Sequence, residues 1–455
     1  MEVLNSIFYF VIVIGILVVI HEFGHFIAAR MMKMRVETFS IGMGFRLLGW
    51  NKKNGFSFGA LAEDFDGEGH TDYRLSLFPI GGYVKISGMV DESFDTKFAG
   101  TEPQPYEFRA KGSFAKAFAI SAGVLMNVLL AVFLFSLITF TEGETLRGTT
   151  TVGYVEKNSV SERIGFKTGD RILTVNNKKS ESWEEALEAM TLNDMGSLKV
   201  IKINRNSIDT VLNADGGELI KALSSEKSLG LSNENSLVFF EAVETLMPAG
   251  KAGMKEGDTL VSINGIPVAS TYQMVEIVRN NKQIPLFFIW KHGSELKSDS
   301  ITPTRDGLIG VGLSQVYTGS LIHRSFSLTG SIEKGINETY RSVELFYSSM
   351  VQIFRGTIQA KQALGGPIMI AKRASQQAEM GLIYFLHFMG LLSMSLAIIN
   401  ILPFPALDGG HLLFIIIEGI FRKEIPVKVK MAFQQVGIAL LLILMAFVVY
   451  NDIVR

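Results

Sequence analysis

The chain of 455 residues contains no cysteine. This absence excludes disulfide bonds, thiol catalysis, iron–sulfur clusters and cysteine-ligated zinc, so any transition metal must be held by His, Asp or Glu. An excess of positive charge is missing as well, because 43 Lys and Arg residues stand against 44 Asp and Glu residues. A protein whose main task is to coat nucleic acid is therefore excluded, and no nucleic-acid partner is expected. Charged residues make up 19% of the chain, less than the usual share of roughly a quarter.

The apolar residues are bunched into four long runs. The first run contains three ionisable side chains, His21, Glu22 and His25, and the other three runs contain no charge. Each run reaches the length of about 20 residues that a helix needs to cross a bilayer. We therefore expect transmembrane helices within residues 7–29, 117–140, 380–407 and 432–450. The alternative, four buried helices of a large soluble protein, is disfavoured because such helices seldom run so far without a charge.

Lysine and arginine residues gather at two of the connections between these runs. They are Arg30, Lys33, Arg35, Arg46, Lys52 and Lys53 after the first run, Arg109, Lys111 and Lys116 before the second, and Arg422, Lys423, Lys428 and Lys430 between the third and the fourth. By the positive-inside rule, both connections face the cytoplasm. The termini and the long insert between the second and third runs then lie on the opposite side of the membrane.

The long insert contains an internal repeat. Residues 165–176 read G-F-K-T-G-D-R-I-L-T-V-N, and residues 253–264 read G-M-K-E-G-D-T-L-V-S-I-N, an offset of 88. Each copy is followed by a helical stretch and then by a run in which apolar residues alternate; the helices are predicted at 183–190 and 272–278, and the strands near 198–203 and 285–290. The repeating unit is thus turn, strand, helix and strand.

Two residues of each copy suit a tight turn. Gly169 and Gly257 allow a backbone conformation that other residues resist, and Asp170 and Asp258 are expected to tie the turn to neighbouring amides. The G-x-x-x-G-D-x-[IL]-[LV]-x-[VI]-N signature resembles a PDZ domain of the kind found in exported bacterial proteases. PDZ domains bind an extended peptide by adding it as a strand to a sheet edge, so peptide ligands are expected. The alternative is a pair of spacer domains that bind nothing and act as size filters.

The first run carries the motif H-E-x-x-H. On a helix, His21 and His25 lie four residues apart on one face, so both imidazoles can reach a single zinc ion. Glu22 lies beside that face and can accept a proton from the attacking water. Ionisable groups within a membrane segment are costly unless they are paired, and they usually mark function.

Two histidines do not complete a zinc site, which needs a third protein ligand. Asp408 is the only charge between Glu379 and Glu418, and it lies in a Pro- and Gly-rich stretch that breaks the third run. Broken helix at membrane depth is tolerated only where protein buries it or water reaches it. We therefore predict zinc on His21, His25 and Asp408, with His411 as the lesser alternative for the third ligand. His387, alone on an apolar helix, is interpreted as packing.

H-E-F-G-H in the first run and N-x-x-P-x-P-x-L-D-G in the third resemble the site-2 protease family of intramembrane metalloproteases. The tandem PDZ pattern narrows the resemblance to the bacterial, RseP-like branch, peptidase family M50B, and the resemblance covers essentially the whole chain. It implies one zinc ion on His21, His25 and Asp408, with Glu22 as the general base. It also implies that Asn400 helps to hold the substrate backbone.

The expected fold class is a polytopic α-helical membrane protein with four transmembrane helices, a cytoplasmic membrane-associated β-hairpin and two α+β PDZ domains between helices two and three. The hairpin is predicted within 73–86, where alternation continues on both sides of a Pro-Ile-Gly-Gly turn. Its open edge could capture an unwound substrate by strand addition; a purely supporting hairpin is the alternative. The expected parts are a first membrane part at 1–147, PDZ domains at 148–232 and 233–317, an amphipathic helical linker at 318–379 and a second membrane part at 380–455.

The expected function is zinc-dependent cleavage of the transmembrane segments of single-pass membrane proteins, in regulated intramembrane proteolysis. The resemblance implies anti-sigma factors that have already been trimmed once, and remnant signal peptides, as substrates. It also implies a multi-pass protein of the bacterial inner membrane, with the PDZ domains on the periplasmic side and the active site near the cytoplasmic side. The competing hypothesis is a catalytically inactive PDZ-bearing adaptor or transporter, which would hold no zinc.

Overall fold

The computed structural model describes residues 2–61, 67–89, 102–191, 197–224, 229–354 and 365–454. The chain divides into two compact units: the first joins Met1–Glu142 to Ser325–Arg455, and the second is Gly143–Arg324. Among the described residues, four helices, all in the first unit, are long and apolar enough to cross a membrane: Val3–Met31, Ser113–Glu142, Leu382–Ile401 and Val427–Val454. They overlap the four apolar runs, so the prediction of four helices with the length and composition of a membrane span is confirmed.

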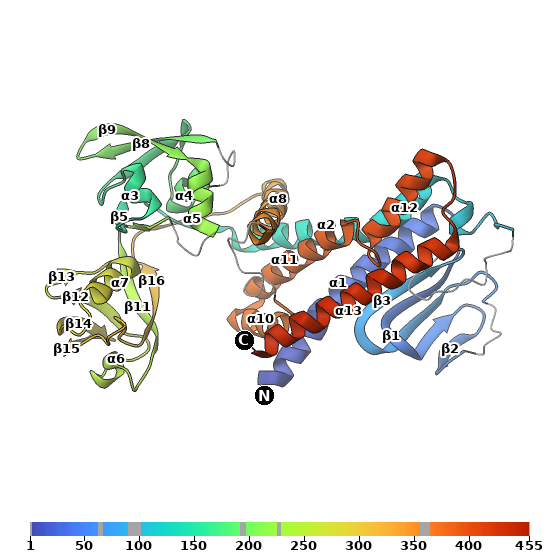
Figure 1. Ribbon diagram of the computed structural model, residues 1–455, viewed down its shortest axis with the longest axis horizontal. Coiled ribbons are helices and arrows are strands. Elements are labelled where there is room, and N and C mark those ends of the chain that lie inside the picture. The colour runs from blue at the N-terminus through green and yellow to red at the C-terminus, as the bar shows by residue number, and fades with distance from the viewer. Residues whose placement is uncertain are drawn as a thin grey trace. The chain divides into compact units, whose positions relative to one another are not determined.

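Helices make up most of the first unit (Figure 1). They are α1 (Glu2–Met31), α2 (Ser113–Glu142), α8 (Leu328–Phe354), α10 (Pro367–Met380), α11 (Leu382–Ile401), α12 (Asp408–Phe421) and α13 (Val427–Val454), with a short 3-10 helix at Phe108–Ala110. Helix α2 packs against α1, α8, α11 and α12. The spacing of apolar residues from Ser331 to about Gln359 predicts an amphipathic helix, and α8 confirms it as far as Phe354; residues 355–359 lie outside the described residues.

Glycines let the helices of this unit approach closely. A Cβ atom on Gly24 of α1 would lie 2.4 Å from the Ala122 carbonyl oxygen of α2, and one on Gly390 of α11 would lie 2.7 Å from the Phe135 ring. Small residues at such crossings allow backbone-to-backbone packing, which drives helix association inside a bilayer. Gly24, the fourth residue of H-E-F-G-H, therefore lets the motif pack closely against α2.

The helix of the third apolar run stops before the end of the run, as the Pro- and Gly-rich stretch predicts. Helix α11 ends at Ile401, and α12 begins at Asp408. Pro403 and Pro405 lie in the connection and cannot donate backbone hydrogen bonds to a continuing helix. The spanning helix is therefore shorter than the run 380–407, and the site motif lies between two helices.

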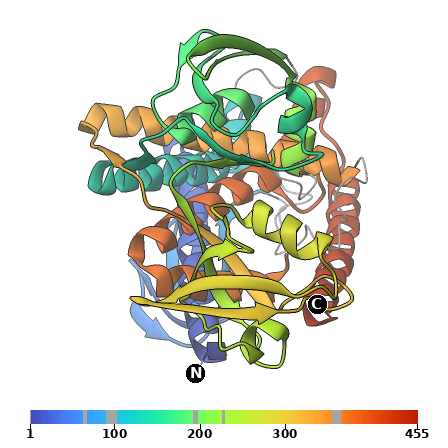
Figure 2. The same cartoon turned by 90° about the vertical axis from the view of Figure 1, so that its left-hand side faces the viewer.

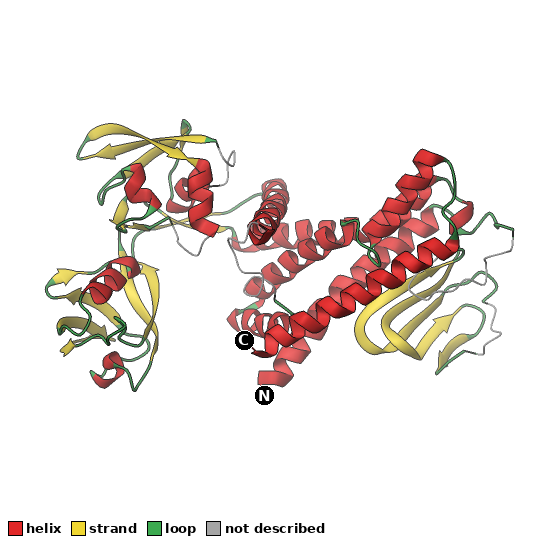
Figure 3. Ribbon diagram, in the orientation of Figure 1, coloured by secondary structure: helices red, strands yellow, loops and turns green. Residues whose placement is uncertain are grey.

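A small sheet in the first unit is built from β1 (Val36–Asn51), β2 (Gly55–Phe58) and β3 (Asp72–Ile86), in the order β2-β1-β3. Figure 3 shows these strands as one group beside the helices of their unit. The predicted hairpin is wrong in its pairing: Thr38 lies opposite both Asp72 and Lys85, and Ile41 lies opposite both Leu75 and Gly82. The two segments that were expected to pair with each other, 72–75 and 82–86, thus lie on either side of the first part of β1.

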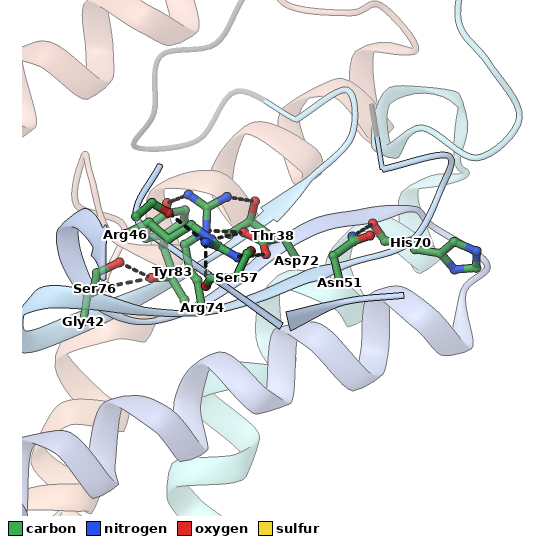
Figure 4. Close-up of polar contacts among 12 residues, drawn as sticks. Thr38, Gly42, Arg46, Asn51, Ser57, His70, Asp72, Arg74, Ser76 and Tyr83 are labelled. Carbon is green, nitrogen blue, oxygen red and sulfur yellow. Dashed lines mark hydrogen bonds and ion pairs between the residues drawn. The ribbon is translucent and has the colours of Figure 1, made fainter. Parts of the chain in front are cut away.

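A buried arginine links the three strands of this sheet. Arg46 binds both carboxylate oxygens of Asp72, at 3.1 and 3.2 Å, and donates to the backbone oxygens of Ser57 and Gly59. Arg74 holds the same carboxylate through its Nε atom at 2.9 Å. Figure 4 shows Arg46 and Arg74 converging on Asp72. Fork-shaped contacts of this kind fix both distance and orientation.

We expect Arg46→Ala to loosen the sheet, because the buried Asp72 carboxylate then keeps only one charged partner. Removing one member of a buried ion pair costs about 3 kcal/mol, so amide exchange across β1 and β3 should accelerate by about 100-fold. Hydrogen exchange on the purified full-length protein measures this. The matched control is Lys53→Ala, whose pair with Glu68 is largely exposed and contributes under about 1 kcal/mol. Equal exchange in the two variants would contradict the assigned role.

The second unit contains two copies of one arrangement of strands and helices. In the first copy the sheet order is β7-β6-β8-β9, and in the second it is β15-β14-β12-β11-β16, with β13 beside β12. Figure 2 shows the two copies as separate green and yellow groups within this unit. The corresponding elements are β6 (Arg171–Val175) and β12 (Thr259–Ile263), β7 (Lys178–Lys179) and β13 (Ile266–Pro267), α4 (Trp183–Thr191) and α7 (Thr271–Asn280), β8 (Leu198–Arg205) and β14 (Leu286–His292), and β9 (Ile208–Asp215) and β15 (Glu295–Ile301). The predicted repeat, with its helices and strands, is confirmed.

The remaining elements of this unit complete and join the copies. They are β4 (Glu144–Arg147), β5 (Val152–Val155), α3 (Val160–Ile164), α5 (Gly216–Ser224), β10 (Leu231–Asn233), β11 (Ser236–Val243), α6 (Pro248–Lys251), β16 (Val311–Tyr317) and β17 (Leu321–Arg324). Each copy has its own hydrophobic core, and the largest side chains in these cores are Trp183 in the first and Trp290 in the second.

The predicted turn chemistry is also confirmed in both copies. Gly169 and Gly257 have φ values of 91° and 92°, in the left-handed region that favours glycine. Asp170 accepts a hydrogen bond from the Lys167 amide at 2.7 Å, and Asp258 accepts one from the Lys255 amide at 2.9 Å. These contacts explain why the glycine–aspartate pair recurs at the repeat distance.

Candidate metal centre

Three side chains from two distant parts of the first unit meet at one point. The Nε2 atoms of His21 and His25 lie 3.1 Å apart, one turn of α1 separating the residues. Asp408 places Oδ2 at 3.1 Å from the His21 Nε2 and at 3.4 Å from the His25 Nε2. Within the described part of the chain, these three are the residues whose His and carboxylate atoms group closely enough to share a metal ion. The structure thus brings the predicted ligand set together.

The start of α12 aims Asp408 at the two histidines. Asp408 lies in the first turn of this helix, where the helix dipole favours a carboxylate. The next two residues must be small: a Cβ atom on Gly409 would lie 2.0 Å from the Leu402 carbonyl oxygen, and one on Gly410 would lie 2.5 Å from that of Phe404. The two glycines of the D-G-G sequence therefore allow the loop between α11 and α12 to pack against the first turn of α12.

The spacing of the three atoms fits a zinc ion. Tetrahedral zinc with bonds of about 2.0–2.1 Å separates its ligand atoms by about 3.3–3.4 Å, and the three separations here are 3.1, 3.1 and 3.4 Å. Asp408 Oδ2 is buried, and no hydrogen-bond donor reaches it from the described residues. A buried carboxylate oxygen without a donor is costly, and a cation between the three atoms would remove that cost.

Helix α2 supplies the floor of this centre through residues one turn apart. A Cβ atom on Gly123 would lie 2.4 Å from the His25 Nε2 and 2.7 Å from the His21 Nε2. The Ala119 carbonyl oxygen lies 2.9 Å from the His25 Nδ1, and the Asn127 side chain lies 3.1 Å from the His21 Nδ1. Any larger residue at Gly123 would displace the two ring nitrogens.

The centre opens into a cavity of about 500 Å³. Glu22 lines this cavity, and its carboxylate accepts a backbone hydrogen bond from Val84 of β3. Asn400, near the end of α11, lines it as well. A Cβ atom on Gly82 would lie 3.3 Å from the Glu22 Cγ, so β3 passes directly beside the glutamate. The structure therefore places Glu22, Asn400 and the sheet around one space.

The other histidines lie elsewhere or face other partners. His411 lines the same cavity, and its Nε2 lies 3.0 Å from the Gln434 side chain of α13. His387 is 4.0 Å from a carboxylate oxygen of Glu338 and packs on the Phe135 ring, in agreement with its interpretation as packing. His292 and His323 belong to the second unit, where they contact Asp258 and Thr145.

Gly123 and Asn127 belong to no motif that the sequence predicts as functional. Both lie in the second apolar run, where their contacts with the histidines depend on how two helices cross. A weak signal was present, since Asn127 is the only carboxamide side chain between Ala117 and Phe140. A polar residue at that depth is usually functional or paired.

Comparisons with known proteins agree with this centre. The model of peptidase family M50 matches residues 9–444, so the chain belongs to peptidase family M50. A Vibrio cholerae protein named as a zinc metalloprotease is 28% identical over 482 residues, which cover 100% of this chain and 99% of the relative. A Neisseria meningitidis protein with a similar name is 31% identical, with 99% of each chain covered. The regulator of sigma-E protease RseP of Escherichia coli is 28% identical, with 98% of each chain covered.

These matches define the class of enzyme. The chain is a zinc-dependent metalloendopeptidase, and its four apolar helices make it a membrane protein. Its resemblance to the RseP-like proteases extends over nearly the full length of both chains.

Proposed function

We propose that the cavity in the first unit is the active site of an intramembrane protease and that His21, His25 and Asp408 hold one zinc ion. The observation that carries this proposal is the meeting of these three side chains, from α1 and α12, beside Glu22 in one cavity. Two neutral imidazoles and one carboxylate are a suitable donor set for zinc and leave a fourth position open. Zinc bound there supplies a Lewis acid that polarises a peptide carbonyl and makes water a stronger nucleophile.

The chain's own residues carry the proton transfers. Glu22 accepts a proton from the attacking water on its carboxylate and then donates it to the leaving amine. The backbone hydrogen bond from Val84 orients that carboxylate. Asn400 holds the substrate backbone through its carboxamide, whose oxygen and nitrogen can pair with a peptide group. All three residues line the same cavity, which supports these roles.

The proposed substrates are transmembrane segments of single-pass proteins, cut near the cytoplasmic face of the bacterial inner membrane. A peptide bond inside a helix is shielded and hydrogen-bonded, so a substrate must unwind before it can be attacked. The edge of the sheet near Gly82 and Val84 lies beside Glu22, and an unwound segment could pair with it as an added strand. The relatives' name, regulator of sigma-E protease, favours a place in a sigma-E pathway, and we propose an anti-sigma-type regulator as one substrate.

We propose that the repeats in the second unit are two PDZ domains, at 148–232 and 233–317, on the periplasmic side. The shared glycine–aspartate turn and the matching strand–helix–strand order support this proposal. Their role is to restrict entry to trimmed chains, either by binding new peptide ends or by acting as size filters. The competing function, an inactive adaptor or transporter, has no specific observation in its favour.

The test is cleavage of a tagged single-pass substrate by the purified protein. We expect about one zinc ion per chain, and we expect a strong zinc chelator to slow cleavage by at least about 100-fold, because the Lewis acid is then removed. Added zinc should restore the rate. A chain that purifies without zinc and cleaves nothing would favour the adaptor. Cleavage that proceeds unchanged after zinc removal would overturn the proposed chemistry.

A further inference from the structure

Three residues of α2, each one turn from the next, face the H-E-x-x-H motif. Ala119, Gly123 and Asn127 are spaced at i, i+4 and i+8, so they lie along one side of the helix. Gly123 makes room for the two Nε2 atoms, Ala119 contacts the His25 Nδ1, and Asn127 contacts the His21 Nδ1. Each ring nitrogen of His21 and His25 therefore has a neighbouring residue on this side of α2.

The His25 end of this row determines the tautomer of that ring. His25 Nδ1 lies 2.9 Å from the Ala119 carbonyl oxygen. A carbonyl oxygen only accepts hydrogen bonds, so the Nδ1 atom carries the proton. The Nε2 atom, which points to Asp408 and His21, therefore keeps its lone pair in the neutral ring. This is the form in which an imidazole binds a metal through Nε2.

His21 must also carry its proton on Nδ1, so that its Nε2 atom keeps the lone pair that binds a metal. His21 Nδ1 lies 3.1 Å from the Asn127 side chain, at the position assigned to the amide nitrogen Nδ2. The amide oxygen Oδ1 is buried and receives no hydrogen bond from the described residues. A protonated Nδ1 cannot bind an NH2 group, since both are donors. Turning the amide over exchanges oxygen and nitrogen at nearly the same positions and presents an acceptor to His21.

We infer that Asn127 is a positioning residue: its Oδ1 accepts the Nδ1–H of His21 and so holds the His21 Nε2 lone pair toward the zinc position. This inference rests on the proposed zinc site. Asn127 is itself held firmly, because its side chain is fully buried and its backbone oxygen accepts a 2.8 Å hydrogen bond from the Ser393 hydroxyl of α11. Partners of this kind orient ligating histidines and raise their basicity.

The test compares Asn127→Asp with Asn127→Leu in the full-length protein, with zinc affinity measured by competition against a chelator series. Leucine has a similar volume and cannot accept a hydrogen bond, so zinc should bind about 10–100-fold more weakly. Aspartate can only accept, so zinc should bind as tightly as in the wild type or more tightly. If the amide nitrogen were the group that serves His21, aspartate would fail as leucine does. Equal weakening in both variants would therefore overturn the inference.

Two controls separate this role from general packing and from the zinc site itself. Ser395→Ala, on the same helix α11, removes a hydroxyl that donates to the Leu391 carbonyl oxygen of its own helix, so it should keep near wild-type zinc affinity. Should Asn127→Leu fail to fold, the zinc affinity of Asn127→Asp still tests the inference, because binding weaker than that of the wild type would overturn it. His21→Ala should lose zinc; if it binds zinc like the wild type, the ligand assignment fails. If His21→Ala loses zinc while Asn127→Leu keeps wild-type affinity, the proposed role of Asn127 is overturned and the zinc site stands.

Discussion

Replacing Glu22 by glutamine is expected to slow peptide cleavage by about 1,000-fold and to leave zinc in place. The variant keeps the size of the side chain but removes the carboxylate that accepts the proton of the attacking water. General acid–base catalysis contributes about 10²–10⁴-fold, and here one residue serves as both base and acid. Glu22 lies beside the two histidines and is not among the three residues that group as possible ligands, so zinc binding should persist.

The measurement is a cleavage assay on a tagged transmembrane substrate, combined with zinc analysis of the same purified sample. The matched control is Glu338→Gln on α8, where the carboxylate is partly exposed and contacts Arg341 and His387. We expect that control to cleave at the wild-type rate. Unimpaired cleavage by Glu22→Gln would sink the proposed proton transfer. Loss of zinc together with loss of cleavage would show instead that the glutamate acts on the metal.

Replacing Asp408 by asparagine is expected to weaken zinc binding by at least about 100-fold and to abolish cleavage. The carboxamide has nearly the same shape, so the connection between α11 and α12 should survive. What is lost is the negative charge that approaches both Nε2 atoms within 3.4 Å. Two neutral imidazoles alone leave the charge of a divalent ion unbalanced in a buried setting.

The matched control for this variant lies one turn further along the same helix. His411 lines the same cavity but contacts Gln434 of α13. Since His411 was the alternative third ligand, His411→Gln decides between the two residues, and we expect it to retain zinc. If His411→Gln loses zinc while Asp408→Asn keeps it, the ligand assignment is wrong. Zinc content by elemental analysis and affinity by chelator competition give the answer.

Local patterns made much of the centre predictable. His21 and His25 meet because their spacing of four matches one helical turn, which tertiary packing does not alter. Asp408 could be predicted because it is a lone charge among helix-breaking residues within an apolar region. The repeat in the second unit was predictable for a similar reason: the turn that Gly169 and Asp170 form depends on residues close in sequence.

Features that depend on contacts between distant segments could not be predicted. Ala119 and Gly123 look like ordinary membrane-helix residues, since small residues are common wherever such helices pack, and Asn127 carries only the weak signal of a polar residue in an apolar run. Their role depends on the crossing of α1 and α2. The pairing of β1 between the two arms of β3 is equally non-local, because alternation indicates strands but not their neighbours.

The distribution of tryptophan gives this protein three separate optical reporters. The chain has only three tryptophans: Trp50 is in the sheet of the first unit and is 47% exposed, whereas Trp183 and Trp290 are buried in the cores of the first and second repeats. Indole emission shifts with the polarity of its surroundings, so each region carries its own fluorophore. Variants that retain a single tryptophan would let the melting of each repeat, and any event at the sheet, be followed one at a time in the intact enzyme.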